Sequence, residues 1–259
     1  MEILALVLLA FFATGYFVLA GADLGTGMLL PYLGRGDRER RLVIASFAPF
    51  FLGNEVWLVA TAGILVGCFP DLEGELLTGQ FPVLVPLLTG WIVRDVGLWS
   101  RSRGPGRRWR ALCDGAVVCG SWAVVLAWGW LLAGPLAGAP YTPAGGLPAV
   151  LTALATAALF GAHGLGFATL RLTGAPYERA RRLVGRTSGS WHSFALTAML
   201  LAVLTLLAGT ALSPAGATAD GATLAFLVPA LLVLTPLLVA GQAWTWWTFR
   251  HRVTRPSYL

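Results

Sequence analysis

Seven long apolar stretches, separated by shorter polar segments, dominate the pattern of hydrophobic positions along the chain. Each is close to the ~20 residues that a helix needs to cross a bilayer. The strands of a membrane barrel are shorter and alternate in polarity, so these uniformly apolar stretches do not fit a barrel. We therefore predict helices over residues 4–30, 44–68, 80–100, 112–133, 147–171, 190–212 and 223–250.

The composition supports an all-α polytopic membrane protein. The 259 residues are 57% hydrophobic and only 12% charged, whereas soluble domains carry about 25% charged residues. Residues 18–20 (Val-Leu-Ala) resemble a signal-peptide cleavage site, but no basic residue precedes the first apolar run. We therefore expect the first helix to be retained as a membrane span.

The arginines predict an orientation in the membrane. All 18 basic residues are arginine, and apart from Arg94 they lie at the end of, or after, the first, third, fifth and seventh predicted helices. The alternate segments, 69–79, 134–146 and 213–222, contain none. By the positive-inside rule, the N-terminus lies outside and the C-terminus is cytoplasmic. This placement explains the net charge of +6 by contact with a lipid membrane, without a nucleic-acid partner.

An internal repeat divides the chain. "LAGADLGTGML" at 19–29 and "LFGAHGLGFATL" at 159–170 share residues at an offset of 140, and "RLV" at 41–43 recurs at 182–184. Parallel repeats of this kind relate two bundles about an axis along the membrane normal. We predict a four-helix unit over residues 1–135 and a truncated second repeat of three helices over residues 146–259.

Ionisable residues at membrane depth mark candidate functional positions, because a charge in hydrocarbon costs several kcal/mol unless it is paired. Asp23, Glu55 and His163 lie well inside predicted spans, and each is either a structural contact between helices or part of a proton path, cofactor contact or partner contact. Three others lie nearer the ends of spans, where the alternative is solvation, pairing with loop arginines or snorkelling to the surface: Arg94, Asp95 and Asp114.

Several chemistries lack their motifs. The sequence contains no GxxxxGK[ST] loop, no HExxH and no Cys/His cluster with the spacing of metal ligands. Its three histidines lie on three different segments, which makes a poor haem-ligand set. We expect no metal site and no residue with a direct catalytic role, and no cofactor-binding residue can be named.

The N-terminal quarter resembles a known family. "GYFVLAGADLGTGMLLPYLGRGDRERRLVIASFAPFFLGNEVWLVATAGIL" at 15–65 is similar to the start of subunit II of cytochrome bd quinol oxidases. Weaker matches are "VGLWSRSR" at 96–103, "RALCDGAVVCGS" at 110–121, "GAHGLGFATLRLTG" at 161–174 and "AWTWWTFRHRV" at 243–253.

The resemblance implies a place in a bacterial respiratory chain, in the plasma membrane. It implies a complex that oxidises a quinol and reduces dioxygen to water. Subunit I of such a complex carries haem b, a third haem (d or b) and the quinol site. Subunit II packs against it and contributes polar residues to a proton route from the cytoplasm. A structural quinone is a further candidate ligand, and small single-span accessory subunits are further candidate partners.

The resemblance also assigns roles to residues. The proton-path candidates are Asp23, Glu55 and Asp114, and the candidates for polar support are Asn54, Arg94 and His163. The chain departs from the family pattern at Ala20 and Leu52, where members have Asp. It also has seven predicted helices where members typically have nine, so we expect two family helices to be missing.

Two other functions stay open. Ala20 and Leu52 favour a non-catalytic scaffold or assembly subunit of a related quinol oxidase, without a proton route. A small secondary transporter is the weaker alternative, because no pair of broken helices around a substrate cavity is evident.

Overall fold

The computed structural model describes residues 1–104, 106–185, 189–212 and 216–255. Within these ranges the chain is helical and contains no strand, and seven helices are long and apolar enough to cross a membrane. This confirms the prediction of an all-α polytopic protein. The seven are α1 (Glu2–Met28), α4 (Phe51–Cys68), α6 (Phe81–Ser100), α7 (Arg107–Leu136), α8 (Gly146–Arg171), α10 (Ser190–Thr210) and α11 (Gly221–Thr248).

Four shorter helices complete the described chain: α2 (Leu30–Leu33), α3 (Asp37–Phe47), α5 (Pro70–Gly79) and α9 (Gly174–Val184). The predicted span 44–68 was wrong at its start, because α3 ends before Pro49 and a separate helix begins at Phe51. Proline has no amide hydrogen for a helix, which is consistent with a break there. The segment 69–79, predicted as a loop, is α5; Asp71 in its first turn complements the helix dipole.

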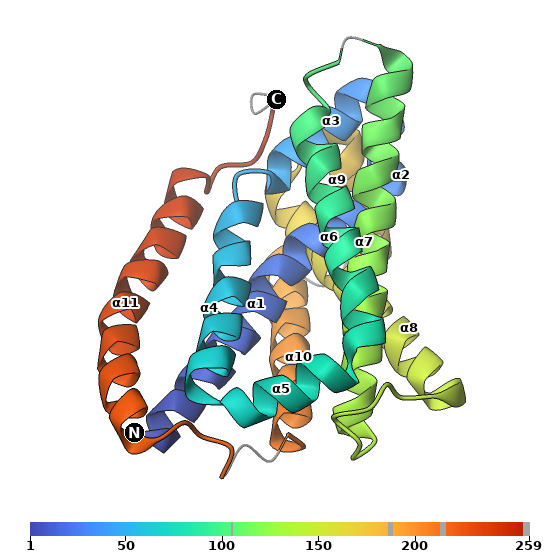
Figure 1. Cartoon of the computed structure of the whole chain (residues 1–259). Helices are drawn as coiled ribbons and strands as arrows, with labels where there is room; N and C mark the ends of the chain where they lie inside the picture. The colour runs from blue at the N-terminus through green and yellow to red at the C-terminus, as the bar shows by residue number, and fades with distance from the viewer. Residues whose placement is uncertain (105, 186–188, 213–215, 256–259) are drawn as a thin grey trace.

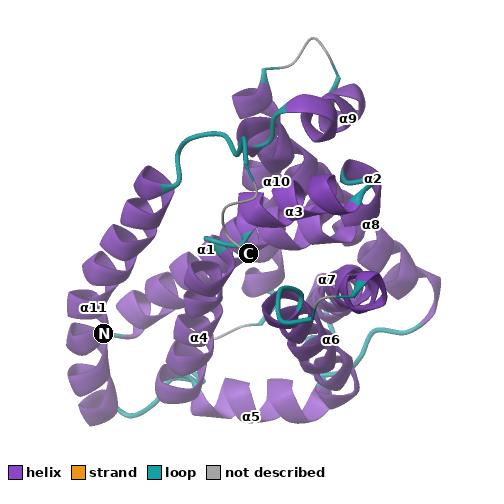
Figure 2. Ribbon diagram, turned by 90° about the horizontal axis from the view of Figure 1, so that it is seen from above, coloured by secondary structure: helices purple, strands orange, loops and turns teal. Residues whose placement is uncertain are grey.

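The helix α1 lies at the centre of the bundle and packs against α4, α7, α8 and α10. The helix α5 runs crosswise at one end and connects α4 to α6 (Figures 1 and 2). The helix α11 stands at the edge, where most of its contacts are with α4 and α1 (Figure 2). Most of its side chains are exposed, so much of its surface is available to lipid or to another chain.

The two helices of the predicted repeat pack directly on each other. A Cβ atom on Gly25 of α1 would overlap the carbonyl group of Phe160, and one on Gly164 of α8 would overlap the backbone of Gly25. The Thr26 hydroxyl is 3.2 Å from the Gly164 carbonyl oxygen at this crossing. Small residues permit such close helix approach in membranes. The division into units at 1–135 and 146–259 stays a prediction.

A second glycine contact holds α6 against α7. A Cβ atom on Gly120 would lie 2.5 Å from the carbonyl oxygen of Gly90 and 2.7 Å from the backbone nitrogen of Arg94. A Cβ atom on Gly97 would lie 2.8 Å from the carbonyl oxygen of Cys113. Backbone contact along this seam fixes the height and rotation of α6, and therefore the direction in which Arg94 projects.

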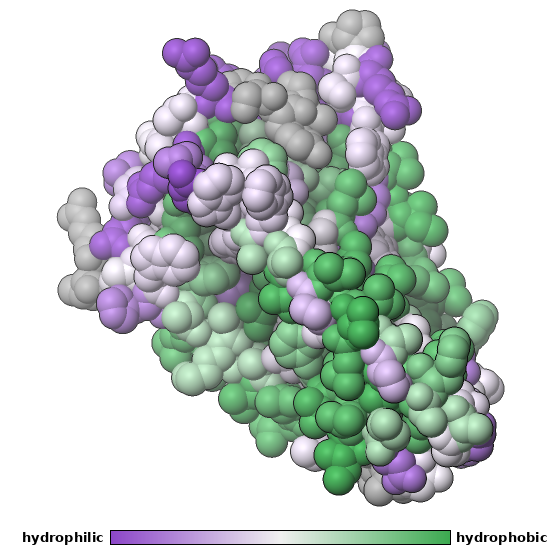
Figure 3. Space-filling model, turned by 90° about the vertical axis from the view of Figure 1, so that its left-hand side faces the viewer, coloured by the Kyte–Doolittle hydropathy of each residue, from purple (hydrophilic) through white to green (hydrophobic). Residues whose placement is uncertain are grey.

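Three arginine-bearing segments meet at one end of the bundle. Arg101 and Arg40 both pair with Asp114, at 2.5 and 3.2 Å, and Arg179 pairs with Glu39 at 2.6 Å. Figure 3 shows hydrophilic residues gathered toward one end of a face that is otherwise mostly apolar. Arg186 lies outside the described residues, as do residues 213–215. That the arginine end faces the cytoplasm stays a prediction of the positive-inside rule.

Candidate functional site

A buried guanidinium is the centre of the candidate site. The Arg94 side chain is 2% exposed, and its Nη2 donates to Oδ1 of Asp23 at 2.6 Å. Its Nη1 donates to Oδ1 of Asp95 at 3.1 Å and lies 3.5 Å from Oε1 of Glu55. One arginine of α6 therefore binds three carboxyl groups, which come from α1, α4 and α6 itself.

A line of amides extends this contact to the edge of the bundle. Asn54 donates from Nδ2 to Oδ2 of Asp23 at 2.7 Å and to the carbonyl oxygen of Leu19 at 3.0 Å. Gln242 of α11 donates from Nε2 to Oδ1 of Asn54 at 2.9 Å. The set Asp23, Asn54, Glu55, Arg94 and Asp95 is called the Arg94 cluster below.

The local sequence explains how these side chains meet. Asn54 and Glu55 are consecutive on α4, so they project about 100° apart, one toward Asp23 and the other toward α6. On α6, Trp91 and Arg94 are three residues apart and share a face. The indole N–H of Trp91 donates to Oε1 of Glu55 at 2.7 Å. The interhelical contacts at this level thus include polar side chains of α4 and α6.

Burial divides the cluster into an inner and an outer part. The Asp23 side chain is 3% exposed, whereas those of Glu55 and Asp95 are 17% and 23% exposed. The inner pair Asp23–Arg94 is thus sealed from the surroundings, and the Phe51 ring lies 5.6 Å from the guanidinium carbon. Glu55 and Asp95 form the outer, partly exposed edge of the cluster.

The charge of the cluster is unbalanced. Three carboxyl groups meet one guanidinium, so complete ionisation would give −3 + 1 = −2 in a largely buried site. An uncompensated charge at membrane depth is costly, and burial favours the neutral form of a carboxyl group. The arrangement therefore favours retention of protons on the carboxyl groups that are least well paired.

Four of the six residues proposed from the sequence, Asp23, Asn54, Glu55 and Arg94, converge in this cluster. The Arg94 side chain is buried and paired, so it does not extend to the surface. For Asp95 the sequence left solvation or pairing with loop arginines as the alternative, whereas the structure pairs it with Arg94 in the cluster. Its position beside Arg94 in the sequence is the signal that points to this pairing, because a charge at membrane depth requires a partner.

Two further residues of the site, Trp91 and Gln242, were missed. Gln242 is a lone polar side chain in a long apolar helix, and the criterion applied to Asn54 would have flagged it. Trp91 had no such signal, because tryptophan is common in membrane helices and its hydrogen bond depends on which helix lies opposite.

Asp114 lies in a different group. It accepts from Nε of Arg101 at 2.5 Å and from Nη1 of Arg40 at 3.2 Å, at the arginine end of the bundle. Arg101 also donates to Oδ1 of Asp37 at 2.9 Å. This pairing with loop arginines is the alternative that the sequence left open for Asp114, and its part in a proton path stays a prediction.

His163 is also separate from the cluster. Its Nε2 is 2.9 Å from the carbonyl oxygen of Val18, which can only accept, so Nε2 carries a hydrogen. Its Nδ1 is 2.7 Å from the hydroxyl oxygen of Thr197, and its ring stacks on Phe194 at 4.5 Å. His163 is therefore a fully engaged polar link between α1, α8 and α10.

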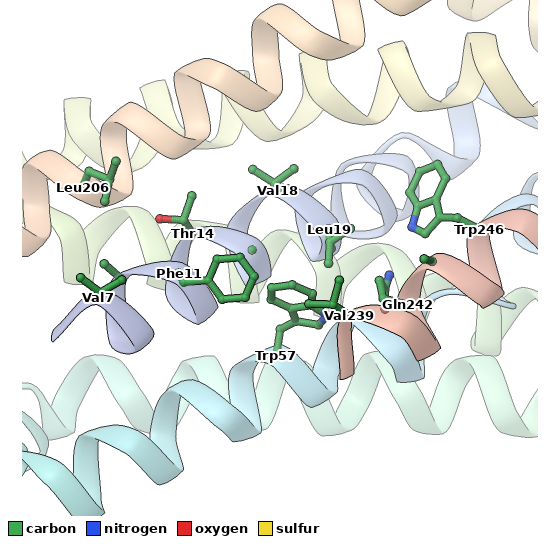
Figure 4. A pocket seen from close by; sticks show the side chains of 13 residues that line it. Val7, Phe11, Thr14, Val18, Leu19, Trp57, Leu206, Val239, Gln242 and Trp246 are labelled. Carbon is green, nitrogen blue, oxygen red and sulfur yellow. The ribbon is translucent and has the colours of Figure 1, made fainter. Parts of the chain in front are cut away.

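An apolar groove opens beside the cluster, between α1, α4, α10 and α11 (Figure 4). Its volume is about 660 Å³, and Gln242 brings it next to Asn54. Within the described part of the chain, neither the Trp246 indole N–H nor the Thr14 hydroxyl, both of which line the groove, has a hydrogen-bond partner. The groove therefore has an apolar lining, and these two donors are buried in its wall. Among the described residues, no group of three His, Cys, Asp or Glu side chains could hold a metal ion.

Comparison with known proteins gives the family. The sequence profile of the cytochrome bd terminal oxidase subunit II family matches residues 1–217. The chain belongs to this family.

Two relatives of the cytochrome bd family show the extent of the match. The chain is 35% identical to the cytochrome bd-I ubiquinol oxidase subunit 2 of Escherichia coli (strain K12) over 127 residues, 49% of this chain and 34% of that protein. It is 30% identical to the cytochrome bd ubiquinol oxidase subunit 2 of Bacillus subtilis (strain 168) over 193 residues, 71% of this chain and 57% of that protein. The chain thus matches between one third and somewhat over half of the length of these relatives.

Proposed function

We propose that the chain is a membrane subunit of a bd-type quinol oxidase, that it packs against a haem-bearing subunit I, and that the Arg94 cluster takes part in proton uptake from the cytoplasm. Family membership supports the first part. The convergence of Asp23, Glu55 and Arg94 at membrane depth supports the last, and it is the observation on which the proposal mainly rests.

The haems belong to the partner in this proposal. Both ring nitrogens of His163 are engaged, by Thr197 and Val18. His192 is exposed in the first turn of α10, and His251 is exposed in the segment after α11. These residues do not fit a haem. We therefore assign haem b and the third haem, d or b, to subunit I, together with oxidation of the quinol.

The proton role follows from the chemistry of oxygen reduction. Reduction of dioxygen to water consumes protons, and a route through a membrane needs groups that accept and release them. The outer carboxyl groups, Glu55 and Asp95, are partly exposed and can exchange protons with the surroundings. Arg94, which is paired with Asp23, carries the positive charge that stabilises a deprotonated carboxylate beside it. Asp114, at the arginine end, is the candidate for entry.

Purification of the chain from its native membrane tests the assignment. We expect a haem-bearing multi-span protein to copurify in fixed ratio, with the absorption bands of haem b and of the third haem. Recovery of the chain with no haem-bearing subunit would overturn the assignment and leave the transporter alternative, for which reconstituted flux without a partner is the test.

Conservative substitutions test the proton role separately. We expect Asp23→Asn and Glu55→Gln each to lower quinol-dependent oxygen consumption at least about tenfold, the effect of about 1.4 kcal/mol on the barrier. The matched control is Glu75→Gln, an exposed carboxyl of α5. Unchanged turnover in an intact complex would support the scaffold alternative, which Leu52 and Ala20 favour.

The groove is the proposed place for a structural quinone. The carbonyl oxygens of a quinone accept hydrogen bonds, and the Trp246 indole and Thr14 hydroxyl are donors in an apolar wall suited to an isoprenoid tail. We expect quinone to be extracted from the purified protein, and Trp246→Phe to reduce the amount. Extraction of phospholipid alone from this groove would contradict the assignment.

A further inference from the structure

The outer edge of the Arg94 cluster contains two carboxyl groups that share one donor. Glu55 and Asp95 both face Nη1 of Arg94, with Oδ1 of Asp95 at 3.1 Å and Oε1 of Glu55 at 3.5 Å. Two carboxyl groups at one guanidinium nitrogen favour a state in which they are not both ionised.

The shared donor favours one retained proton. Like charges in one site oppose joint ionisation, so one of the pair is expected to keep its proton. An ionised carboxylate has acceptors only, so a hydrogen bond between the two also needs a proton on one of them. Among the described residues, the ion pairs of Asp23, Glu55 and Asp95 all go to Arg94, so that single cation must serve all three.

The remaining contacts identify which groups stay charged. Asp23 accepts from Arg94 and from Asn54, so it is the best-paired carboxylate of the three. Asp95 is nearer to the guanidinium than Glu55 is, and so the charge of the outer pair rests more favourably on Asp95. On Glu55, Trp91 and Arg94 both donate to Oε1, which leaves Oε2 free to carry a hydrogen.

The neighbouring titratable group does not supply the missing charge. Tyr16 of α1 faces the cluster, and its hydroxyl oxygen accepts from the Trp128 indole at 3.1 Å. A neutral phenol adds no positive charge. The groups that face Glu55 and Asp95 are therefore Tyr16 and Asp23 of α1 and Arg94 of α6.

We propose that Glu55 and Asp95 hold one shared proton, carried on Oε2 of Glu55 and hydrogen-bonded to the Asp95 carboxylate. This proton reduces the formal charge of the cluster from −2 to −1. Because both side chains lie at the partly exposed edge, the proton is accessible from outside while Asp23–Arg94 remains sealed. Asp95 thereby becomes a proton-holding residue of this chain.

This inference deepens the proposed function, which assigns proton handling to the same cluster. Its test measures the protonation of carboxyl groups by infrared spectroscopy and not oxygen reduction, so the two proposals can fail separately. A shared proton that plays no part in turnover would leave the inference standing and remove the proposed function.

The experiment compares infrared spectra of the purified complex with those of its variants at neutral pH. A protonated carboxylic acid has a C=O stretch that a carboxylate lacks, and this band shifts in D₂O. We expect the wild-type-minus-variant difference to contain this band for Glu55→Gln and for Asp95→Asn. In each variant the remaining carboxyl group ionises against Arg94. The control Asp71→Asn, at an exposed position of α5, retains the band.

Labelling assigns the proton to one side chain. We expect carbon-13 in the glutamate carboxyl groups to shift the band that Glu55→Gln removes. A band that persists in full in Asp95→Asn would overturn the proposal, because the proton would then not depend on the pair. Absence of the band from both differences would overturn it too. If one variant fails to accumulate, the other and the labelled wild type still decide.

Discussion

Removal of the one cation of the Arg94 cluster should destabilise the protein severely. Arg94→Met keeps much of the side-chain volume and deletes the guanidinium that three carboxyl groups contact. Asp23 is the most affected, because its side chain is 3% exposed and loses a 2.6 Å partner that water cannot replace. Asn54 alone would then donate to it.

The expected cost is about 3–5 kcal/mol, the range for breaking a buried ion pair by removing one partner. Glu55 and Asp95 add less, because they are partly exposed and can take up protons. Most of the loss should therefore arise from Asp23. It follows that Asp23→Asn in the Arg94→Met background should restore stability, with a coupling energy of about 2 kcal/mol.

The assay is unfolding of the protein as purified from membranes, partners included, by titration of SDS into detergent micelles with circular dichroism as the readout. Arg103→Met, at an exposed position after α6, is the matched control and should change stability by no more than about 0.5 kcal/mol. If Arg94→Met costs under about 1 kcal/mol, or if the two substitutions simply add, the ion pair is not what holds this site together.

Two further substitutions test the packing around the site by the same titration. Gly120→Ala should cost about 1–3 kcal/mol, because its Cβ would lie 2.5 Å from the carbonyl oxygen of Gly90 and force α6 away from α7. Gly115→Ala, on the same helix with nothing within 4 Å of its Cβ, should be neutral or slightly stabilising. Equal costs for the two substitutions would contradict the close backbone contact between α6 and α7. Thr197→Val should cost about 1–3 kcal/mol, because it leaves Nδ1 of buried His163 without a partner; a neutral Thr197→Val would mean that this hydrogen bond is dispensable.

The long helices were predictable because length and apolar character together identify a membrane span. Predicted boundaries at 147–171 and 190–212 differ by at most two residues from those of α8 and α10. The short helices were not predictable in the same way. The helix α5 is only 10 residues long, too short for a membrane span, and it lies in the segment 69–79 that the pattern of spans predicts as a loop. A helix of that length gains most of its stability from tertiary packing, which the sequence alone does not display.

The residues of the candidate site were largely predictable from the sequence, but the pairs that they form were not. That Asp23, Glu55 and Arg94 need partners follows from the cost of unpaired charge in lipid. That they are one another's partners depends on the order of helices around α1. This order is set by backbone contacts such as Gly90 with Gly120, which no periodicity reveals. For Asp95 the alternative of solvation was open for the same reason: it lies near the end of its span, and only the direction of the Arg94 side chain shows that the two pair.

The position of Leu52 bears on the departure from the family pattern that the resemblance implies. Leu52 and Glu55 are three residues apart on α4 and so share a face, and Leu52 is 47% exposed. An aspartate at 52 would therefore lie on the outer side, one turn from Glu55 along the same helix. In this chain the second carboxyl group beside Glu55 comes instead from Asp95 on the neighbouring helix. The outer edge of the cluster thus keeps two carboxyl groups, which are both held by Arg94. A leucine at 52, where the resemblance implies an aspartate, therefore does not by itself argue against the proposed proton-holding site.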